Sequence, residues 1–179
     1  MSVIVFGEGP LAERIRSGVV SDTTAAVVVS GVDGRQGIGP VHELTDEIID
    51  AVFEQPMQRV IGALQQAHAD GCVRIVVVVP TSGMSGAALH VAHAALAEAV
   101  HILVKSAARQ WGVRGITVNT VAVDPSWFDI DPMVAGPVSI APRALSRDAD
   151  PLGAIGWLCG ESAADVTGQT IVCDGGLWM

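Results

Sequence analysis

The residues best suited to chemistry lie between a buried apolar run at 73–79 and a long helical pattern at 86–111. His93 can transfer a proton near neutral pH, and the hydroxyl of Ser82 can hydrogen-bond a carbonyl oxygen. Ala97 stands one helical turn after His93, so no cation on that helix face assists it. The main interpretation of His93 is a packed helix histidine, and the alternatives are a partner or ligand contact and a catalytic acid.

Metal chemistry is poorly supported. His90 and His93 lie three residues apart on one helix face, but no acidic or cysteine ligand stands close to them in sequence. The three cysteines lie far apart at positions 72, 159 and 173 and form no CxxC pair. We therefore expect no metal site, and we expect reduced, buried thiols in a cytoplasmic protein.

A glycine turn at 7–10 offers a second kind of chemistry, phosphate binding. Gly7, Gly9 and Ala12 fit the spacing GxGxxA after a short apolar run. However, Glu8 places a negative charge in the turn, and Pro10 lacks the N–H that a phosphate needs. The turn is interpreted as structural, with Gly7 and Gly9 as weak candidates for binding a cofactor phosphate. The similar string GRQGIG leads into a proline and not into a helix, so it indicates an ordinary loop.

Composition limits the classes of function. The chain has 179 residues, of which 50% are hydrophobic and 16% charged, with a net charge of −9. One domain, 1–179, is expected, and the acidic charge argues against nucleic-acid binding. No run is apolar for long enough to predict a membrane span, and the N-terminus predicts a strand and not a leader. The apolar surface that remains favours an assembly.

The elements that must position these residues alternate between strands and helices. Strands are predicted at 2–6, 24–32, 73–79, 115–122 and 168–176. Helices are predicted from Pro10, from Thr45 to 70, at 86–111 and at 150–162, and a loop is predicted at 124–150. Thr45 is expected to cap its helix, Pro56 to kink it or split it in two, and Gly71 to end it. The pattern predicts an α/β fold with a Rossmann-like parallel sheet of about five or six strands, right-handed crossovers and helices on both faces.

Several strings resemble the short-chain dehydrogenase/reductase (SDR) family, in its 3-oxoacyl reductase branch. They are GPVHELTDEIIDAVF, VRGITVNTVAVDP and, most specifically, DVTGQTIVCDGG. The chain is shorter than family members, and the resemblance places the gap between the first helix and Thr24. It implies that the family's second and third strands are missing and that 24–32 is its fourth strand. The alternative is a second strand of a generic dinucleotide fold, with Asp33 as the ribose ligand.

The resemblance also implies that the catalytic positions have changed. The family's tyrosine position is His93 and its lysine position is Ala97. Its serine falls at or next to Pro80, with Thr81 and Ser82 as neighbours, and its asparagine falls at Pro56. The family's Asn-Asn-Ala-Gly turn falls on 30–33, and the Pro-Gly that seats the nicotinamide falls on 123–124. Structural positions match the family pattern, namely Asn119, Gly168, Asp174 and Gly175.

These substitutions favour a non-catalytic, SDR-like subunit. It is expected to assemble with itself or with an active SDR relative, such as a 3-hydroxyacyl-CoA dehydrogenase or 3-oxoacyl reductase. The contacts would come from the helices at 44–70 and 86–111 and from the C-terminal segment. One alternative is an NAD(P)-dependent oxidoreductase of 3-oxoacyl or related carbonyl substrates that uses His93. The other is a protein that binds acyl-CoA-type small ligands beneath the 124–150 loop. No cofactor is expected, and NAD(P) is the one expected if any binds.

Overall fold

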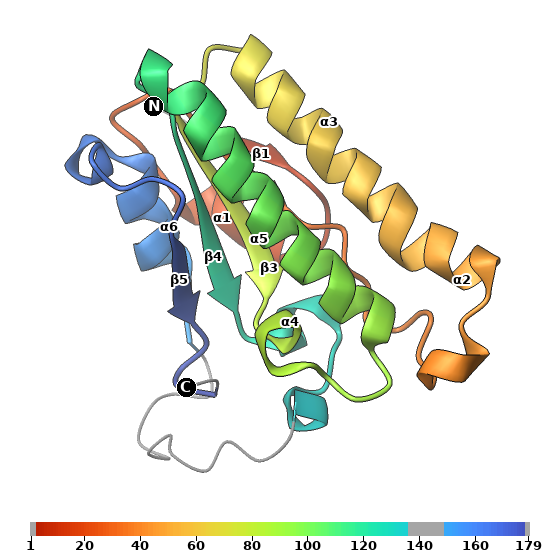
Figure 1. Ribbon diagram of the computed structural model, residues 1–179. Helices are drawn as coiled ribbons and strands as arrows, with labels where there is room; N and C mark the ends of the chain where they lie inside the picture. The colour runs from red at the N-terminus through yellow and green to blue at the C-terminus, as the bar shows by residue number, and fades with distance from the viewer. Residues whose placement is uncertain (1–2, 136–148, 178–179) are drawn as a thin grey trace.

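The computed structural model describes residues 3–135 and 149–177, and they contain a five-stranded parallel sheet (Figure 1). The strand order equals the chain order, β1-β2-β3-β4-β5. The strands are β1 Ile4–Phe6, β2 Ala25–Val29, β3 Arg74–Pro80, β4 Thr117–Val123 and β5 Thr170–Cys173. The predicted Rossmann-like α/β fold is therefore confirmed, with five strands.

The centre of the sheet is buried on both faces. Every residue of β2, β3 and β4 is buried, because their runs of valine and alanine suit a strand that helices cover on both sides. In register, Val27 pairs with Val5 on one side and with Val76 on the other. These residues form the core that holds the carboxyl ends of the strands in place.

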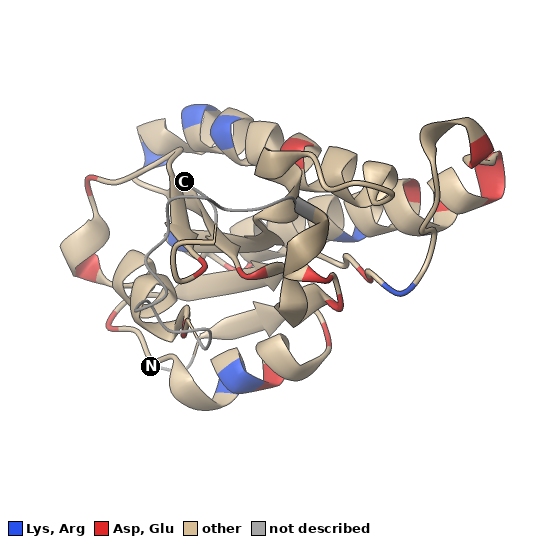
Figure 2. Cartoon of the chain, turned by 90° about the horizontal axis from the view of Figure 1, so that it is seen from below, with Lys and Arg blue, Asp and Glu red and all other residues tan. Residues whose placement is uncertain are grey.

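Two layers of helices cover the sheet. α3 (Gln55–Ala69) and α5 (Val91–Trp111) pack side by side on one face (Figures 1 and 2). α1 (Pro10–Gly18) and α6 (Leu152–Cys159) lie on the other face. These two touch closely, since a Cβ on Gly18 would lie 2.8 Å from Cδ1 of Leu152.

The hand of the connections differs from the prediction. All four connections step across the sheet in the same direction, because the strands follow chain order. Those through α3 and α5 cross one face, and those through α1 and α6 cross the other. Connections on opposite faces that step in the same direction have opposite hands, so the expectation of right-handed crossovers throughout is wrong.

The position of β1 explains the first of these connections. In a complete dinucleotide fold the strand order is 3-2-1-4-5-6. Here β1 is an edge strand and β2 lies between β1 and β3, as expected if β2 is the fourth strand of that order. In the complete fold, the helix after the first strand leads to the second strand. Here α1 leads instead to β2, on the opposite side of β1, and this reverses the hand of the connection.

The helix predicted from Thr45 to 70 is present, with a change of winding in its first half. α2 (Asp46–Ile49) is capped by Thr45, whose side chain accepts a hydrogen bond from the Ile48 N–H. A π-helical segment, Asp50–Glu54, then leads into α3, and Pro56 lies in the first turn of α3. Proline lacks the N–H of a regular helix, so the wider π turn accommodates it without splitting the helix. Gly71, with φ of 76°, follows the helix end as predicted.

The helix predicted at 86–111 begins later than expected. A short helix, α4 (Ser82–Ser85), ends at Gly86 in the left-handed conformation, and α5 begins only at Val91. Between them, Leu89 has φ of 63°, which interrupts any continuous helix. The helical stretch 91–114 is long and apolar enough to cross a membrane, but 56% of its apolar 18-residue window is buried in the fold, as in a core helix.

Short 3₁₀ turns complete the described chain. They are Val41–Glu43, Gly112–Arg114, Pro125–Phe128, Pro132–Ala135 and Glu161–Ala163. The expected loop at 124–150 therefore contains local helical turns, and its residues 136–148 lie outside the described part. Two of the thiols, Cys72 and Cys159, are buried as predicted, whereas Cys173 is half-buried.

The positions that matched the family pattern have structural roles. Asn119 donates to the Val166 carbonyl at 2.7 Å and accepts from the Gln169 N–H at 3.0 Å, so it ties β4 to the chain entering β5. Gly168 and Gly175 adopt positive φ, at 69° and 70°. The Asp174 carboxylate accepts from the N–H groups of the turn that follows it.

Candidate functional site

His93 lies on α5 and is fully buried. Its Nε2 lies 3.0 Å from the backbone carbonyl oxygen of Asp33, in the loop after β2. Because a carbonyl only accepts, this contact requires Nε2 to carry the proton. Burial lowers the pKa of His93, with smaller opposing and reinforcing effects from Asp33 and His90. The ring is therefore a neutral imidazole that donates its Nε2 proton to the protein backbone.

None of the other residues that the resemblance places at catalytic positions has an ionisable side chain. Ala97 is buried, and a Cβ on Gly83 would lie 2.7 Å from the Ala97 Cβ, so a longer side chain has no room there. Ser82 is buried, and its Oγ has no hydrogen-bond partner among the described residues. Pro80 pairs with Val123 in the sheet, and Pro56 is buried on α3.

The loop after β2 is closed over by the segment after β4. The Gly34 N–H donates to the Phe128 carbonyl at 2.8 Å. A Cβ on Gly34 would meet Ile130 Cγ1 at 2.3 Å and the Asp129 carbonyl oxygen at 2.6 Å, so only glycine fits. Phe128 and Ile130 are themselves buried. The two loops therefore pack closely at Gly34, in the region where the resemblance would seat a nicotinamide.

Asp33, the alternative candidate for a ribose ligand, is engaged within its own loop. Its carboxylate accepts from Arg35 Nε at 2.8 Å and from Gln36 Nε2 at 3.0 Å. These contacts, first of all the Arg35 side chain, lower the pKa of Asp33 to about 2. Arg35 also lies 3.5 Å from Asp129, so its charge is already balanced.

His90 and His93 are neighbours, with ring centroids 5.2 Å apart. No group of three potential metal ligands gathers anywhere in residues 3–135 or 149–177. Burial lowers the pKa of His90, and its Nδ1 has no partner within the described chain. The pair therefore packs as two neutral rings.

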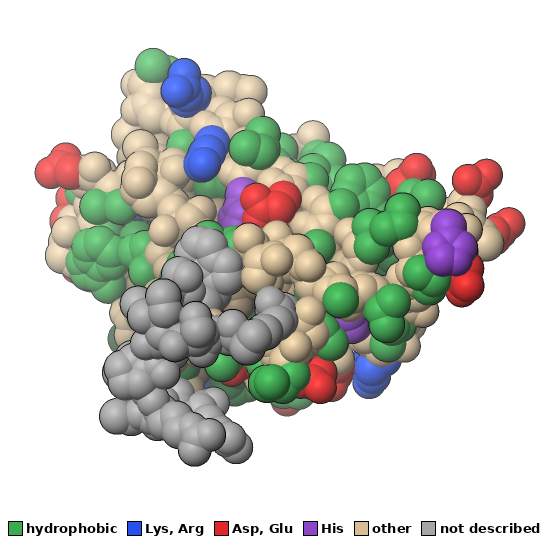
Figure 3. Space-filling view, turned by 60° about the horizontal axis from the view of Figure 1, so that its bottom comes forward, with side chains coloured by type: hydrophobic (Ala, Val, Ile, Leu, Met, Phe, Trp, Pro, Cys, Tyr) green, Lys and Arg blue, Asp and Glu red, His purple; other side chains and the backbone are tan. Residues whose placement is uncertain are grey.

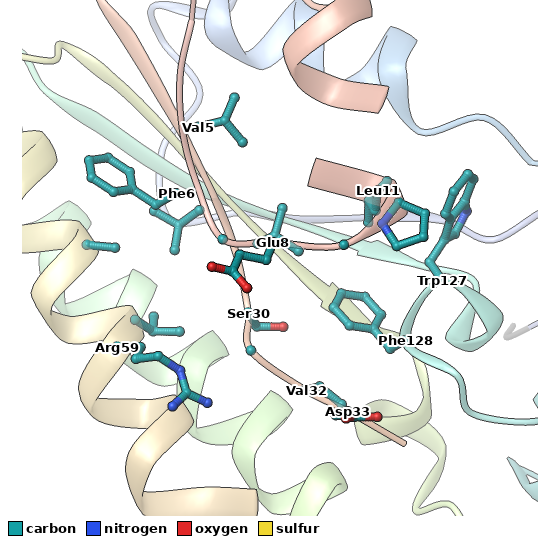
Figure 4. A pocket seen from close by; sticks show the side chains of 18 of the residues that line it. Val5, Phe6, Glu8, Leu11, Ser30, Val32, Asp33, Arg59, Trp127 and Phe128 are labelled. Carbon is teal, nitrogen blue, oxygen red and sulfur yellow. The ribbon is translucent and has the colours of Figure 1, made fainter. Parts of the chain in front are cut away.

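The main cleft, of about 1210 Å³, opens at the carboxyl ends of β1 and β2, between α3 and α1 (Figure 4). Gly7 and Gly9 line it as part of the turn after β1. Gly7 has φ of 114°, and a Cβ there would lie 2.9 Å from the Val29 carbonyl oxygen. Glycine is therefore required at position 7 for the close approach of β1 to β2. His93, Ala97 and Ser82 are not among the residues that line this cleft.

Three polar side chains of the cleft have no hydrogen-bond or ion-pair partner among the described residues. Glu8, from the turn, and Arg59, from α3, form no ion pair or hydrogen bond with any described residue. Ser30 is buried to 2% exposure, and its Oγ also lacks a partner within the described part. Figure 4 shows Glu8 reaching between Phe6 and Ser30, with Arg59 on the α3 side.

A dinucleotide fits these residues poorly. The Glu8 carboxylate occupies the turn that would hold a pyrophosphate, and Pro10 provides no N–H there. β1 is an edge strand, and no described strand lies beyond it to support an adenosine. The packed loops at Gly34 and Ile130 fill the nicotinamide end. The described residues thus lack the usual contacts for each part of NAD(P).

A second, smaller cleft of about 480 Å³ lies beside α1 and the turn after β4. Its lining includes Arg14, Asp124, Trp127 and Asp150. Arg14 and Asp150 pair across it at 2.6 Å, which raises the pKa of Arg14 and lowers that of Asp150. This cleft adjoins the loop for which small-ligand binding was the alternative, but residues 136–148 are outside the described part.

Sequence reasoning found some of this site and missed the rest. It singled out Gly7, Gly9 and the charge of Glu8, and all three line the cleft. It gave no role to Arg59, which is one exposed polar residue among several on α3. It named Ser30 only as a changed family position. The sequence pattern within each helix or strand does not indicate that these side chains, which come from different elements, face one cleft.

Comparison with known proteins gives a consistent result. The family model described as enoyl-(acyl carrier protein) reductase matches residues 22–178. That match begins after β1 and α1, at the point where the sequence resemblance placed the missing strands.

Curated relatives match most of the chain. It is 30% identical over 163 residues to an A-factor type gamma-butyrolactone 1'-reductase of Streptomyces virginiae, covering 79% of this chain and 62% of the relative. It is 28% identical over 143 residues to the 3-oxoacyl-[acyl-carrier-protein] reductase FabG of Staphylococcus epidermidis, covering 75% and 57%. The chain thus spans about 60% of the length of such relatives.

Solved structures share the fold. A mutant short-chain dehydrogenase/reductase of Serratia marcescens superposes with a TM-score of 0.67 at 26% identity, covering 86% of this chain and 65% of that one. A 4-hydroxyisoleucine dehydrogenase complexed with NADH and succinate superposes with a TM-score of 0.62 at 20% identity, covering 84% and 67%. The second likeness concerns the fold alone.

Proposed function

The chain belongs to the short-chain dehydrogenase/reductase family, and we propose that it is a non-catalytic member that acts by assembly. It pairs with itself or with an active family member, such as a 3-oxoacyl reductase or 3-hydroxyacyl-CoA dehydrogenase. It has no NAD(P)-dependent activity of its own. As in the sequence-based expectation, it works in the cytoplasm.

The state of His93 carries this proposal. The side chain at the family's proton-donor position is fully buried, and its Nε2 proton is held by the Asp33 carbonyl. A general acid must reach the atom that it protonates, within about 3 Å or through one water. Ala97 supplies no cation to tune it or to bind a ribose. A reductase mechanism through His93 would therefore need the loop after β2 to move away.

Exposed apolar side chains support the assembly role. Ile102 on α5 is 61% exposed, and Trp157 on α6 is 42% exposed. Hydrophobic side chains are spread over the face seen in Figure 3, with charged side chains between them. α3 and α5 lie side by side, so two copies could pair these helices into a four-helix contact. The half-buried edge strand β5 offers a second contact near the C-terminus.

Two measurements on the purified protein test this function. Light scattering after size exclusion gives the mass alone and after co-expression with a full-length relative, for example a 3-oxoacyl-[acyl-carrier-protein] reductase. Fluorescence titration with NADH and NADPH gives cofactor affinity. We expect a homo-oligomer or a co-purifying complex, and no saturable cofactor binding below millimolar concentration. A stable monomer that does not bind such relatives would refute the assembly role.

One competing function has a specific observation in its favour. The names of the matched relatives include reductases, so an NAD(P)-dependent oxidoreductase using His93 is the second candidate. Micromolar binding of NADH together with turnover of a 3-oxoacyl substrate, lost in His93→Gln, would establish it instead. Binding of acyl-CoA without turnover, detected by a rise in melting temperature, would favour the third, ligand-binding function.

A further inference from the structure

The floor of the main cleft contains a buried hydroxyl that makes no hydrogen bond to any described residue. Ser30 lies just beyond β2, and its backbone N–H donates to the Val78 carbonyl at 2.9 Å. Its Oγ has no partner among the described residues, although only 2% of the residue is exposed. A buried hydroxyl is normally hydrogen-bonded, so an atom from outside the chain is expected at this point of the cleft.

Two opposite charges flank this hydroxyl. Glu8 comes from the turn after β1, and Arg59 comes from α3, on the other wall of the cleft. Within the described part of the chain, neither forms an ion pair. The other charged side chains of the cleft are engaged by protein atoms, namely Arg16, Asp33, Arg35 and Asp129. Of the described charges in the cleft, one anion and one cation are therefore left to face a ligand.

The guanidinium of Arg59 lies over the backbone of Gly31. A Cβ on Gly31 would lie 3.2 Å from Nη2 and 3.3 Å from Nε of Arg59, so the charged group packs directly over this glycine. A guanidinium supported in this way presents a planar fork that matches a carboxylate. Gly31 thus leaves the space that the Arg59 side chain occupies.

The two ends of the cleft are apolar. Phe6 and Val60 line the end near α3, and Trp127 and Phe128 line the end near α1 (Figure 4). Aromatic side chains of this kind favour an apolar or aromatic ligand body. A purely anionic ligand would be repelled by Glu8, and a purely cationic one by Arg59. The lining matches a molecule that carries both charges next to an apolar group.

From these contacts we propose that the cleft binds a zwitterionic small molecule with an apolar body, of the class of the aromatic α-amino acids. Arg59 binds its carboxylate, Glu8 binds its ammonium group, and Ser30 hydrogen-bonds the carboxylate from below. The site goes beyond the assembly role, since it makes this subunit responsive to a metabolite that is not a dinucleotide.

Calorimetric titration of the full chain with matched probes tests the proposal. L-phenylalanine carries both charges, 3-phenylpropionate lacks the ammonium group, and phenethylamine lacks the carboxylate. We expect L-phenylalanine to bind at least about tenfold more tightly than either single-charge probe, because each loses one charge-assisted contact. Equal affinity for the three probes, or no binding of L-phenylalanine up to about 10 mM, would overturn the proposal.

Variants assign each charge to its partner. In Glu8→Gln, 3-phenylpropionate should bind as tightly as L-phenylalanine. In Arg59→Gln, phenethylamine should bind as tightly as L-phenylalanine. Glu13→Gln is the matched control, since Glu13 is exposed on α1 and does not line the cleft. Glu8 and Arg59 are exposed, so all three variants should fold, which an unchanged melting temperature would verify. A discrimination that survives both cleft variants would rule out the assigned contacts.

The outcome is distinguishable from that of the proposed function. Failure of all three probes removes the zwitterion site and leaves the assembly role standing. If NADH binds in the cleft and L-phenylalanine displaces it, the proposal that the protein binds no cofactor is overturned. The three probes would still show whether Glu8 and Arg59 bind the two charges of the ligand.

Discussion

His93 Nε2 lies 3.0 Å from the backbone carbonyl oxygen of Asp33, although 60 residues separate the two in sequence. The contact joins α5 to the loop after β2. The Nε2 proton of His93, which could otherwise be donated to a substrate, is donated to this backbone carbonyl. The relationship places His93 in the core of the protein, and it predicts a specific response to pH.

The free energy of unfolding should fall as the pH drops below about 6.5, the ordinary pKa of histidine. Burial lowers the pKa of His93 in the folded state, so the unfolded chain binds more protons than the folded one in this range. Stability is therefore fully present above the unfolded pKa and is lost as the pH falls toward the folded pKa. Urea unfolding at pH 7.5, 6.5 and 5.5 measures this slope.

The substitution His93→Gln should flatten that slope, because glutamine can still donate to the Asp33 carbonyl but does not titrate. The matched control is His42→Gln, at a side chain that is 81% exposed. Part of the slope should persist in His93→Gln, since burial also lowers the pKa of His90. An unaltered slope in His93→Gln would show that His93 is not a buried neutral donor.

A lysine at position 97, where the resemblance places the family's lysine, should destabilise the fold. Ala97→Lys places an ammonium group in a buried position against Gly83, so we expect a loss of about 3 kcal/mol or more in the free energy of unfolding. Ala95→Lys, on the exposed side of the same helix, should change it by less than about 0.5 kcal/mol. Chemical denaturation measures both. Equal stability of the two variants would mean that the region around Ala97 is open.

The packing of the loops after β2 and β4 depends on Gly34. Gly34→Ala would push a methyl group against Ile130 and the Asp129 carbonyl, and we expect about 1–3 kcal/mol of destabilisation. Gly39→Ala is the control, since a Cβ there meets no atom within 4 Å. The emission of the tryptophans, one of which is Trp127 beside this contact, reports the local change. Identical melting curves for the two alanine variants would contradict a close-packed junction.

A single charged substitution on α5 tests whether this helix forms the assembly surface. Ile102→Glu should lower the mass of the assembly in size exclusion, because a desolvated carboxylate opposes helix pairing. Its protomer stability should stay within about 0.5 kcal/mol, since Ile102 is 61% exposed. Val113→Glu, at a residue 90% exposed beyond the end of α5, is the control and should keep the mass. An assembly that tolerates Ile102→Glu would have to use another surface.

Much of the fold could be predicted because each strand and helix is encoded locally. Continuous apolar runs gave β2, β3 and β4, and the glycine turn gave the junction of β1 and α1. Boundaries failed where backbone conformation depends on neighbours, as at Leu89, whose positive φ interrupts a helix-forming stretch. The hand of the connections could not be predicted from the elements, because it depends on which face each helix covers.

The sequence alone determined which side chains are present: it contains no tyrosine, and the resemblance implies that Ala97 and Pro80 stand at catalytic positions of the family. Residue identity is enough for such statements, since a missing functional group cannot be supplied by folding. Only the tertiary structure decided what the remaining groups do. It buried His93 against Asp33, packed Gly34 on Ile130, and left Glu8 and Arg59 facing one cleft. These are contacts between distant parts of the chain, and they arise only when the sheet brings the carboxyl ends of its strands together.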